Sequence, residues 1–147
     1  MWTSGGAGGE TVGRAGLTVT SLMLANGDPA QVLALVDPDS DLLDALRSSG
    51  RAVVQLLAWE DRDLAEAFAG TAPAPGGLFR TAEFVETDHG PRLARATTYA
   101  AVSLDAEQEI GWSVLVTCRI EDVTVGAEDG PMLGHRRGRF FRLGSVS

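Results

Sequence analysis

Two stretches of the sequence carry side chains that could hold or act on a ligand. In the first, Thr18, Thr20 and Ser21 place hydroxyl groups along and at the end of a predicted strand, and Ser40 begins a predicted helix. Hydroxyl groups beside a helix N-terminus, where backbone N–H groups are free, could hold a phosphate. Ordinary structure explains the same residues, because threonine favours strands and serine commonly caps helices. On these residues alone, both interpretations stay open.

The second stretch is basic and aromatic and covers residues 135–142 (HRRGRFFR). Guanidinium groups suit phosphates and carboxylates, and an aromatic ring can stack on a flat ligand. The alternative is a solvated tail that pairs with the acidic surface of the protein. We give the two interpretations equal weight.

Several other kinds of catalytic site are not indicated. The sequence has no GxSxG elbow, its GGAGGE stretch is not a GxGxxG followed by a helix, and the absence of lysine excludes a P-loop. Cys118 lies in a strand-like run and is expected to be a buried, small hydrophobic residue. The two histidines, His89 and His135, lack the spacing of a zinc site, so we expect no metal centre and place His89 in an exposed loop.

Composition restricts the class of protein further. The chain has 147 residues, 44% of them hydrophobic, and a net charge of −8, which favours one globular domain over residues 1–147. An acidic chain is a poor general binder of nucleic acid or of an anionic membrane surface. No apolar run could span a bilayer and no secretory signal begins the chain, so we expect a cytoplasmic protein. Residues 1–14 form a glycine-rich start that we expect to be partly mobile.

The elements that position these residues are mainly strands. Loop composition at residues 5–16 favours a hairpin connection between a short first strand and a second one. The polar residues 105–111 are expected to connect two long strands as a loop. The order of strands and helices along the chain is not the regular alternation of a doubly wound sheet. It predicts a mainly β barrel with short helices at its ends. The expected strands are residues 17–24, 31–36 (covered on both faces), 52–58, 96–104 and 112–125, and the expected helices are residues 40–49 and 60–69.

Taken in order, these segments resemble the flavin reductase-like family, the FMN-binding split barrels. Residues 17–70 are similar to the family's T-x-S/T-S strand, its apolar strand ending in D/N-x-x-S, and its helix ending in F-A-G. Residues 90–104 look like the family's G-x-P-x-L segment, and residues 130–144 look like its closing P-L-x-Y-H-x-G-R-Y segment. The resemblance covers about residues 15–144. It implies a six-stranded split barrel that forms a homodimer with flavin at the subunit interface.

Position by position, the resemblance also implies a cofactor site. It makes His135 the candidate catalytic residue. By the same resemblance, backbone and hydroxyl contacts along the flavin would come from Thr18, Val19, Thr20 and Ser21. Contacts to the ribityl chain and phosphate would come from Asp37 and Ser40. The site after the second helix would be lined by Phe68 and Ala69, and nucleotide phosphates would be contacted by Arg136 and Arg137.

The implied activity is that of an NAD(P)H:flavin oxidoreductase, in which NADH or NADPH reduces FMN or FAD, and a partner monooxygenase could use the reduced flavin. The sequence departs from the family pattern in three segments. Gly111-Trp112-Ser113 stands where the family often has G-D-H, Leu22 replaces an aromatic residue, and Gly134 replaces a tyrosine. The first departure favours an alternative function, a split-barrel protein that binds flavin or another flat ligand without oxidising a nicotinamide. A third possibility is an interaction domain without a cofactor.

Overall fold

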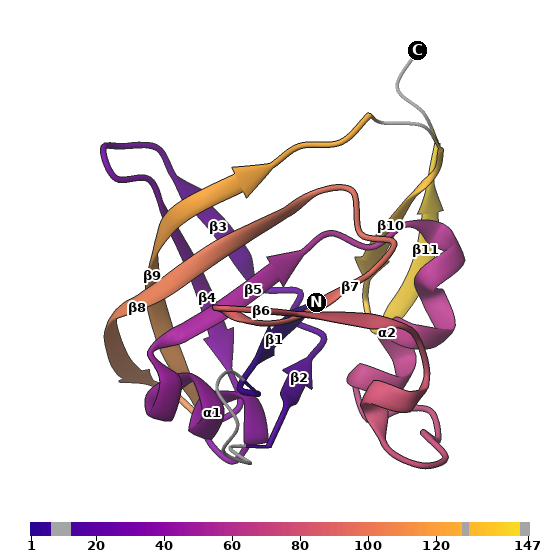
Figure 1. The fold of residues 1–147 in the computed structure, drawn as a ribbon, viewed down its shortest axis with the longest axis horizontal. Coiled ribbons are helices and arrows are strands. Elements are labelled where there is room, and N and C mark those ends of the chain that lie inside the picture. The colour runs from indigo at the N-terminus through magenta and orange to yellow at the C-terminus, as the bar shows by residue number, and fades with distance from the viewer. Residues whose placement is uncertain (7–12, 128–129, 145–147) are drawn as a thin grey trace.

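The structure is a computed structural model that describes residues 1–6, 13–127 and 130–144 (Figure 1). None of the described helices is long and apolar enough to cross a membrane. The helices are α1 (Asp41–Ser49), α2 (Arg62–Phe68) and the short 3₁₀ helices η1 (Trp59–Asp61) and η2 (Leu78–Arg80). The strands are β1 (Trp2–Ser4), β2 (Ala15–Leu17), β3 (Leu22–Ala25), β4 (Gln31–Val36), β5 (Arg51–Gln55), β6 (Phe84–Thr87), β7 (Gly90–Leu93), β8 (Tyr99–Ile110), β9 (Ser113–Thr124), β10 (Met132–Arg136) and β11 (Arg139–Leu143).

The largest sheet curls into a split barrel. Its strand order is β2-β1-β5-β8-β9-β4-β3, and all neighbouring strands are antiparallel. The two edge strands, β2 and β3, follow each other in the chain, so residues 18–21 join the two edges of the sheet. We call residues 18–21 the seam. The mainly β fold is confirmed, and the curled antiparallel sheet has seven strands. The six-stranded ring that the resemblance implies stays a prediction.

The unbroken strand predicted over residues 17–24 is wrong in its middle, because hydroxyl groups take the place of the β-ladder there. The Thr18 hydroxyl donates to the carbonyl oxygen of Ala65 at 2.7 Å. The Ser21 hydroxyl donates to the carbonyl oxygen of Leu35 at 2.9 Å and accepts from the Leu35 amide at 3.0 Å. Such side-chain bonds compete with regular secondary structure. They hold the seam beside the sheet rather than in it.

The strand β4 and the helix α1 match their predicted ranges. The Ser40 hydroxyl caps α1 by accepting from the Leu43 amide at 3.3 Å, and Gly50 ends the helix with a φ of 70°. One detail of the prediction is wrong: β4 is not covered on both faces. Its residues alternate between buried and more exposed positions, and Leu35 is 41% exposed. The outer face of β4 is therefore accessible to a ligand or to another protein surface.

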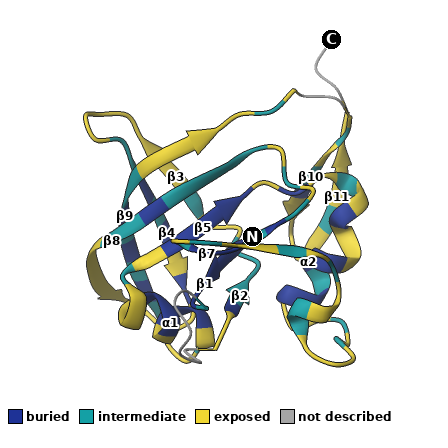
Figure 2. Cartoon of the chain, viewed as in Figure 1, coloured by how far each residue is buried: buried dark blue, intermediate teal, exposed yellow. Residues whose placement is uncertain are grey.

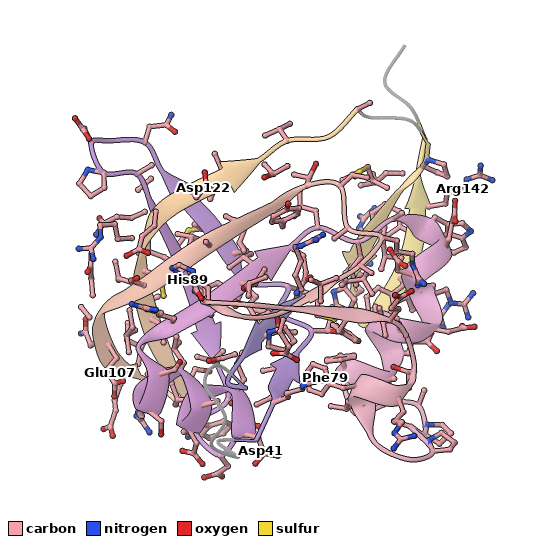
Figure 3. The ribbon with its side chains drawn as sticks, viewed as in Figure 1. Asp41, Phe79, His89, Glu107, Asp122 and Arg142 are labelled. Atoms are coloured by element: carbon pink, nitrogen blue, oxygen red, sulfur yellow. The ribbon has the colours of Figure 1, made fainter. Side chains whose placement is uncertain are left out.

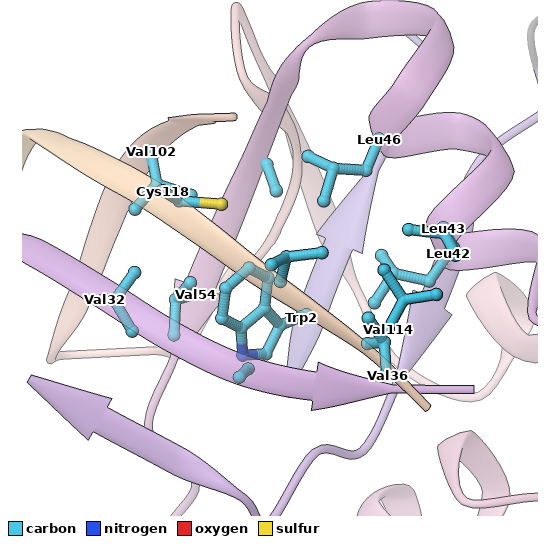
Figure 4. Close-up of a cluster of buried hydrophobic side chains, with 13 residues drawn as sticks. Trp2, Val32, Val36, Leu42, Leu43, Leu46, Val54, Val102, Val114 and Cys118 are labelled. Atoms are coloured by element: carbon cyan, nitrogen blue, oxygen red, sulfur yellow. The ribbon is translucent and has the colours of Figure 1, made fainter. Parts of the chain in front are cut away.

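The barrel is filled by one apolar core, which Figure 4 shows in close-up. Trp2 lies at its centre with no exposed surface, and Leu42, Leu43 and Leu46 of α1 close one end of the barrel. Figure 2 shows the buried residues gathered on the inner strands and the exposed ones at the outer end of β3 and on the hairpin ends. Of the expected glycine-rich start, Trp2–Ser4 is thus a buried strand, and its hairpin pairing with β2 is confirmed. The partial mobility expected for residues 1–14 stays a prediction, because residues 7–12 of that stretch lie outside the described residues.

A second, smaller core packs α2 against the hairpins β6–β7 and β10–β11 at the side of the barrel (Figure 1). Three aromatic rings form its centre: Phe68 lies 5.4 Å from Phe79 and 5.9 Å from Phe84 between ring centroids. Leu133 and Phe140 attach the β10–β11 hairpin to this core. The position of that hairpin beside α2 is therefore fixed by apolar packing.

The polar loop predicted over residues 105–111 is also wrong. Strand β8 continues to Ile110, and only Gly111 and Trp112 form the turn to β9. Gly111 has a φ of 57°, which suits the first central residue of a tight hairpin turn. Arg47 of α1 holds the extended hairpin through Glu107, with contacts of 2.7 and 3.1 Å to the carboxylate.

An ionic cluster joins the β6–β7 turn to the outer face of β8 and β9. His89, labelled in Figure 3, is less exposed than the predicted loop position implies. Its side chain is 18% exposed, and its Nε2 lies 2.6 Å from a Glu121 carboxylate oxygen. The Ser103 hydroxyl donates to the other oxygen of Glu121 at 2.5 Å. Hydrogen bonds from Ser103 and then His89 lower the pKa of Glu121 to about 2.

Replacing Glu121 by glutamine should destabilise the protein most at neutral pH. The folded state holds the pKa of Glu121 below its ordinary value of 4.5, so the carboxylate contributes stability above that pH and loses it as the pH falls toward about 2. Urea unfolding of both proteins at pH 7 and pH 3 should show a stability difference that shrinks at pH 3. Glu83→Gln, at an exposed glutamate outside the cluster, is the control and should change little. A difference that is constant with pH would contradict the assignment.

Candidate functional site

The seam forms one wall of an open groove beside α2, with a volume of about 610 Å³. This volume lies in the range of sites for small molecules. The opposite walls come from α2 and from the β10–β11 hairpin. We call this the α2 groove, and its lining residues are Thr18, Thr20, Arg62, Glu66, Ala69, Thr71, His135, Gly138, Arg139 and Phe140.

Helix α2 contributes one cation and one anion to this groove. Arg62 and Glu66 are four residues apart, which puts them on one face of the helix, and their side chains pair at 3.3 Å. Where the helix ends, the Thr71 hydroxyl donates to the Glu66 carbonyl at 3.1 Å. The Arg62–Glu66 pair leaves α2 nearly neutral toward a ligand in the groove.

The β10–β11 hairpin brings His135 to the groove. The pairing register sets His135 opposite Phe140, and their ring centroids are 5.2 Å apart in an edge-to-face arrangement. The turn between the strands consists of Arg137 and Gly138, which both have positive φ values, 51° and 75°. Sequence reasoning treated this region as one final segment and missed the hairpin, although a glycine between two alternating runs is a signal for such a turn.

Part of the seam makes no backbone hydrogen bonds within the described residues. The Thr18 amide donates to the Phe68 carbonyl at 3.1 Å, but within the described residues neither Val19 nor Thr20 takes part in a backbone hydrogen bond. Val19 is half-buried against the main core, and Thr20 is exposed. Unpaired N–H and C=O groups on an accessible strand edge can bind a ligand's polar rim. The seam therefore offers the groove a short row of hydrogen-bonding groups.

A second groove, also of about 610 Å³, lies where the β8–β9 turn approaches the start of α1. Asp37 lines it and orders the loop, since its carboxylate accepts from the Asp39 amide at 2.9 Å. The Ser40 hydroxyl donates to the Asp37 carbonyl at 2.7 Å while it caps α1. We call this the β4 groove, and its lining residues are Leu35, Val36, Asp37, Pro38, Asp39, Glu109, Gly111, Trp112, Ser113 and Val114.

The predicted site residues thus fall into two groups, and the seam contributes to both of them. Four of them, Thr18, Thr20, Ala69 and His135, line the α2 groove. Asp37 lines the β4 groove, and Ser21 is hydrogen-bonded to Leu35 of the same groove.

The remaining predictions have other placements. Phe68 is buried, with its ring in the second core, so only its carbonyl meets the seam. Arg136 and Arg137 are exposed at the turn of β10–β11, next to the lining residue Gly138. Sequence reasoning missed Arg62 and Glu66, although their spacing on a predicted helix was a usable signal.

Cys118 has the structural role expected for it. Its side chain is fully buried in the main core, and burial raises the pKa of its thiol to about 12. A thiol of that pKa is protonated at neutral pH and is a poor nucleophile. Cys118 therefore takes no part in either groove.

Comparison with known proteins identifies the fold and its relatives. The family profile described as flavin reductase like domain matches residues 1–144. The reductase component of 4-hydroxyphenylacetate 3-monooxygenase from Pseudomonas aeruginosa is 27% identical over 133 residues, which cover 89% of this chain and 78% of that protein. The match to the family thus includes the seam and both grooves.

Two solved structures illustrate the shared fold. The styrene monooxygenase flavin reductase of Pseudomonas putida S12 superposes with a TM-score of 0.81 at 17% identity, covering 99% of this chain and 90% of the other. The NADH:FAD oxidoreductase SgcE6 of Streptomyces globisporus C-1027 has a TM-score of 0.81 at 21% identity, covering 97% of this chain and 83% of the other. At these identities, the two superpositions establish the architecture alone.

Proposed function

The chain belongs to the flavin reductase like domain family, and from that premise we propose that it is an NAD(P)H:flavin oxidoreductase that binds FMN or FAD along the seam. The observation that carries this proposal is the backbone of Val19 and Thr20, which makes no backbone hydrogen bond within the described residues. Thr20 lines the α2 groove, and the next residue, Ser21, is hydrogen-bonded to Leu35 of the β4 groove. A flat ring with a polar rim matches a short row of free N–H and C=O groups. The monooxygenase reductase of Pseudomonas aeruginosa supports a role for this chain as the reductase of a two-component system.

The residues present fit a flavin in three respects. The seam can donate hydrogen bonds to the rim of the ring, where negative charge develops on reduction. The α1 N-terminus, capped by Ser40, suits the phosphate end. The α2 groove leaves room for a second ring beside the first, and His135 lies there with Phe140 against it.

The flavin, when bound, supplies the hydride chemistry, and the chain supplies position and charge. The seam would orient the ring through its backbone and through Thr20. His135 and the neighbouring arginines would hold the nicotinamide nucleotide in the α2 groove. Because these groups only bind and orient, the proposal needs no dedicated acid or base.

We also propose that the protein is a homodimer, which fits an apolar row on the outer face of the barrel. Met23 and Leu35 are 62% and 41% exposed, and they are paired across the sheet with Leu33 and Leu115. Since Leu35 also lines the β4 groove, a second copy on this face would cover that groove. Light scattering coupled to size exclusion should give twice the chain mass. Met23→Glu should shift the protein toward the monomer, and a wild-type monomer at micromolar concentration would contradict the proposal.

A titration with FMN and then FAD, followed by flavin fluorescence, tests the function. NADH and NADPH are then added without oxygen, and flavin absorbance near 450 nm is recorded (roughly the band of the oxidised cofactor). Binding with bleaching is the expected result. Binding without bleaching would favour the second candidate, a flavin- or ligand-binding protein that does not oxidise nicotinamides. That candidate is favoured by Trp112 and Ser113 at the β8–β9 turn, where the family often has Asp-His. Absence of binding would contradict both.

Replacing Thr20 by valine should weaken flavin binding by about 1–2 kcal/mol, the usual cost of losing a hydrogen bond to a polar or charged partner. Thr20 is exposed and lines the α2 groove, so the change should leave the fold intact. Thr124→Val at the outer end of β9, on an exposed residue of neither groove, is the matched control. Fluorescence titration of the three proteins gives the comparison. Equal affinity in all three would remove Thr20 from the site.

A further inference from the structure

The turn of the β10–β11 hairpin concentrates positive charge on an acidic protein. The chain has a net charge of −8, yet residues 132–143 contain four arginines and no acidic residue. Three of them, Arg136, Arg137 and Arg139, lie within four consecutive positions, and we call these three the arginine turn. Arg142 lies at the other end of the hairpin (Figure 3).

The arginine turn is locally unfavourable for the folded chain on its own. Arg136 is paired directly opposite Arg139 across the two strands, and like charges in that arrangement repel. Arg137 has a φ of 51°, and it is the one non-glycine residue with positive φ within residues 1–6, 13–127 and 130–144. That conformation disfavours arginine, while asparagine and glycine tolerate it. A bound anion would offset the repulsion.

The chain supplies no such anion within its described residues. Five other arginines, at positions 14, 47, 62, 95 and 119, pair with carboxylates. None of the three guanidinium groups of the arginine turn has a described carboxylate within 4.0 Å, although the chain contains 20 acidic residues. All three side chains are exposed. The arginine turn is therefore available to an external anion.

The arginine turn borders the α2 groove rather than an isolated surface. Gly138 and Arg139 line the groove together with His135 and Phe140. The one carboxylate among the lining residues, Glu66, is already paired with Arg62. An anionic group at the turn could therefore belong to a larger molecule whose rings occupy the groove.

We propose that the arginine turn binds the 2′-phosphate of NADPH, so that the protein uses NADPH in preference to NADH. This inference rests on the proposed function. The proposed function assigns the flavin phosphate to the α1 N-terminus, which leaves the turn to the second nucleotide. NADPH differs from NADH by a phosphate monoester that carries close to two negative charges at neutral pH. Arginine is the residue type that accommodates this group in other nucleotide sites, and its planar fork matches phosphate oxygens.

The first test compares the two donors with FMN or FAD as acceptor. The value of kcat/KM should be at least about tenfold higher for NADPH than for NADH, which corresponds to about 1.4 kcal/mol. Arg137→Asn is the informative variant, because asparagine tolerates the positive φ and the turn keeps its shape. It should lower kcat/KM for NADPH about tenfold more than for NADH without lowering the melting temperature. Arg80→Asn, on η2 outside both grooves, is the matched control.

The second test measures binding by calorimetry and does not depend on turnover. Adenosine 2′,5′-bisphosphate should bind at least about tenfold more tightly than 5′-ADP, which carries the same number of phosphates. Arg137→Asn should remove that difference. Equal binding of the two nucleotides would indicate a general anion site and overturn the inference, as would competition by FMN or a preference for NADH. If neither donor reduces flavin but the 2′-phosphate is still selected, the proposed function fails, the preference for NADPH as donor fails with it, and the 2′-phosphate site at the arginine turn remains.

Discussion

Replacing Trp2 by alanine should lower the free energy of unfolding by about 3–5 kcal/mol, the usual cost of removing a large aromatic side chain from a core. Trp2 has no exposed surface and lies among the side chains of β4, β9 and α1 (Figure 4). Its removal would leave a cavity among the buried side chains of the main core. Urea unfolding followed by circular dichroism measures the loss.

Trp2→Phe separates packing from hydrogen bonding. Within the described residues, the indole Nε1 of Trp2 has no hydrogen-bond partner although it is buried. Phenylalanine removes that unpaired group and keeps most of the ring, so the cost should stay below about 1.5 kcal/mol. A loss as large as that of the alanine variant would show that the indole N–H has a partner in solution.

Replacing His135 by alanine should reduce kcat/KM for the nicotinamide donor by about 10–100-fold. His135 lines the α2 groove and packs edge-to-face against Phe140 at 5.2 Å between ring centroids, a contact that favours this orientation before the donor binds. Loss of one hydrogen bond to a charged group costs about 1.5–3 kcal/mol, which matches that range. Flavin affinity should change less than about threefold, because the proposed flavin contacts come from the seam.

Stopped-flow reduction of bound flavin, together with a fluorescence titration, measures both quantities for His135→Ala. His135→Gln, which keeps a side-chain donor near the same position, should recover part of the rate. Arg139 is unchanged in both variants, so a difference between His135→Ala and His135→Gln reflects the side chain at position 135. Equal losses of flavin affinity and donor turnover would make His135 a flavin contact instead.

Where local chemistry and tertiary packing agree, the sequence was sufficient to predict the structure. The cap at Ser40, the apolar stripe of α1 and the stop at Gly50 all act over a few residues, and the structure has them as predicted. The apolar run at residues 31–36 is hydrophobic enough to form a strand in almost any context. The family resemblance added the order of these elements, and the fold follows it.

The seam could not be predicted from local chemistry. Thr18 and Thr20 favour strands, so the alternation of residues 17–24 indicates one continuous strand. The interruption comes from bonds to partners that are distant in sequence: the Thr18 hydroxyl binds Ala65, and the Ser21 hydroxyl binds Leu35. The residues best suited to a ligand are thus those where the strand prediction fails.

The loop predicted at the outer end of the β8–β9 hairpin was wrong for the opposite reason. Three of the six residues 105–110 are acidic, and such residues are depleted in strands, so local composition favours a loop. These residues extend beyond the main core, where exposed charges cost little. Long-range ion pairs to Arg47 and Arg119 support the strand instead. Sequence patterns alone do not show which arginines will be near.

The three tryptophans of this chain sit in three different environments, and that distribution gives the protein a built-in set of optical reporters. Trp2 is fully buried, Trp59 is half-buried under Arg62, and Trp112 is 98% exposed at the tip of the β8–β9 hairpin. A small quencher in solution should reach Trp112 first and Trp2 last. Because Trp112 lines the β4 groove, its emission should respond when a ligand or a second copy covers that groove, while the emission of Trp2 follows unfolding. Occupancy and stability can therefore be followed in one sample without a label.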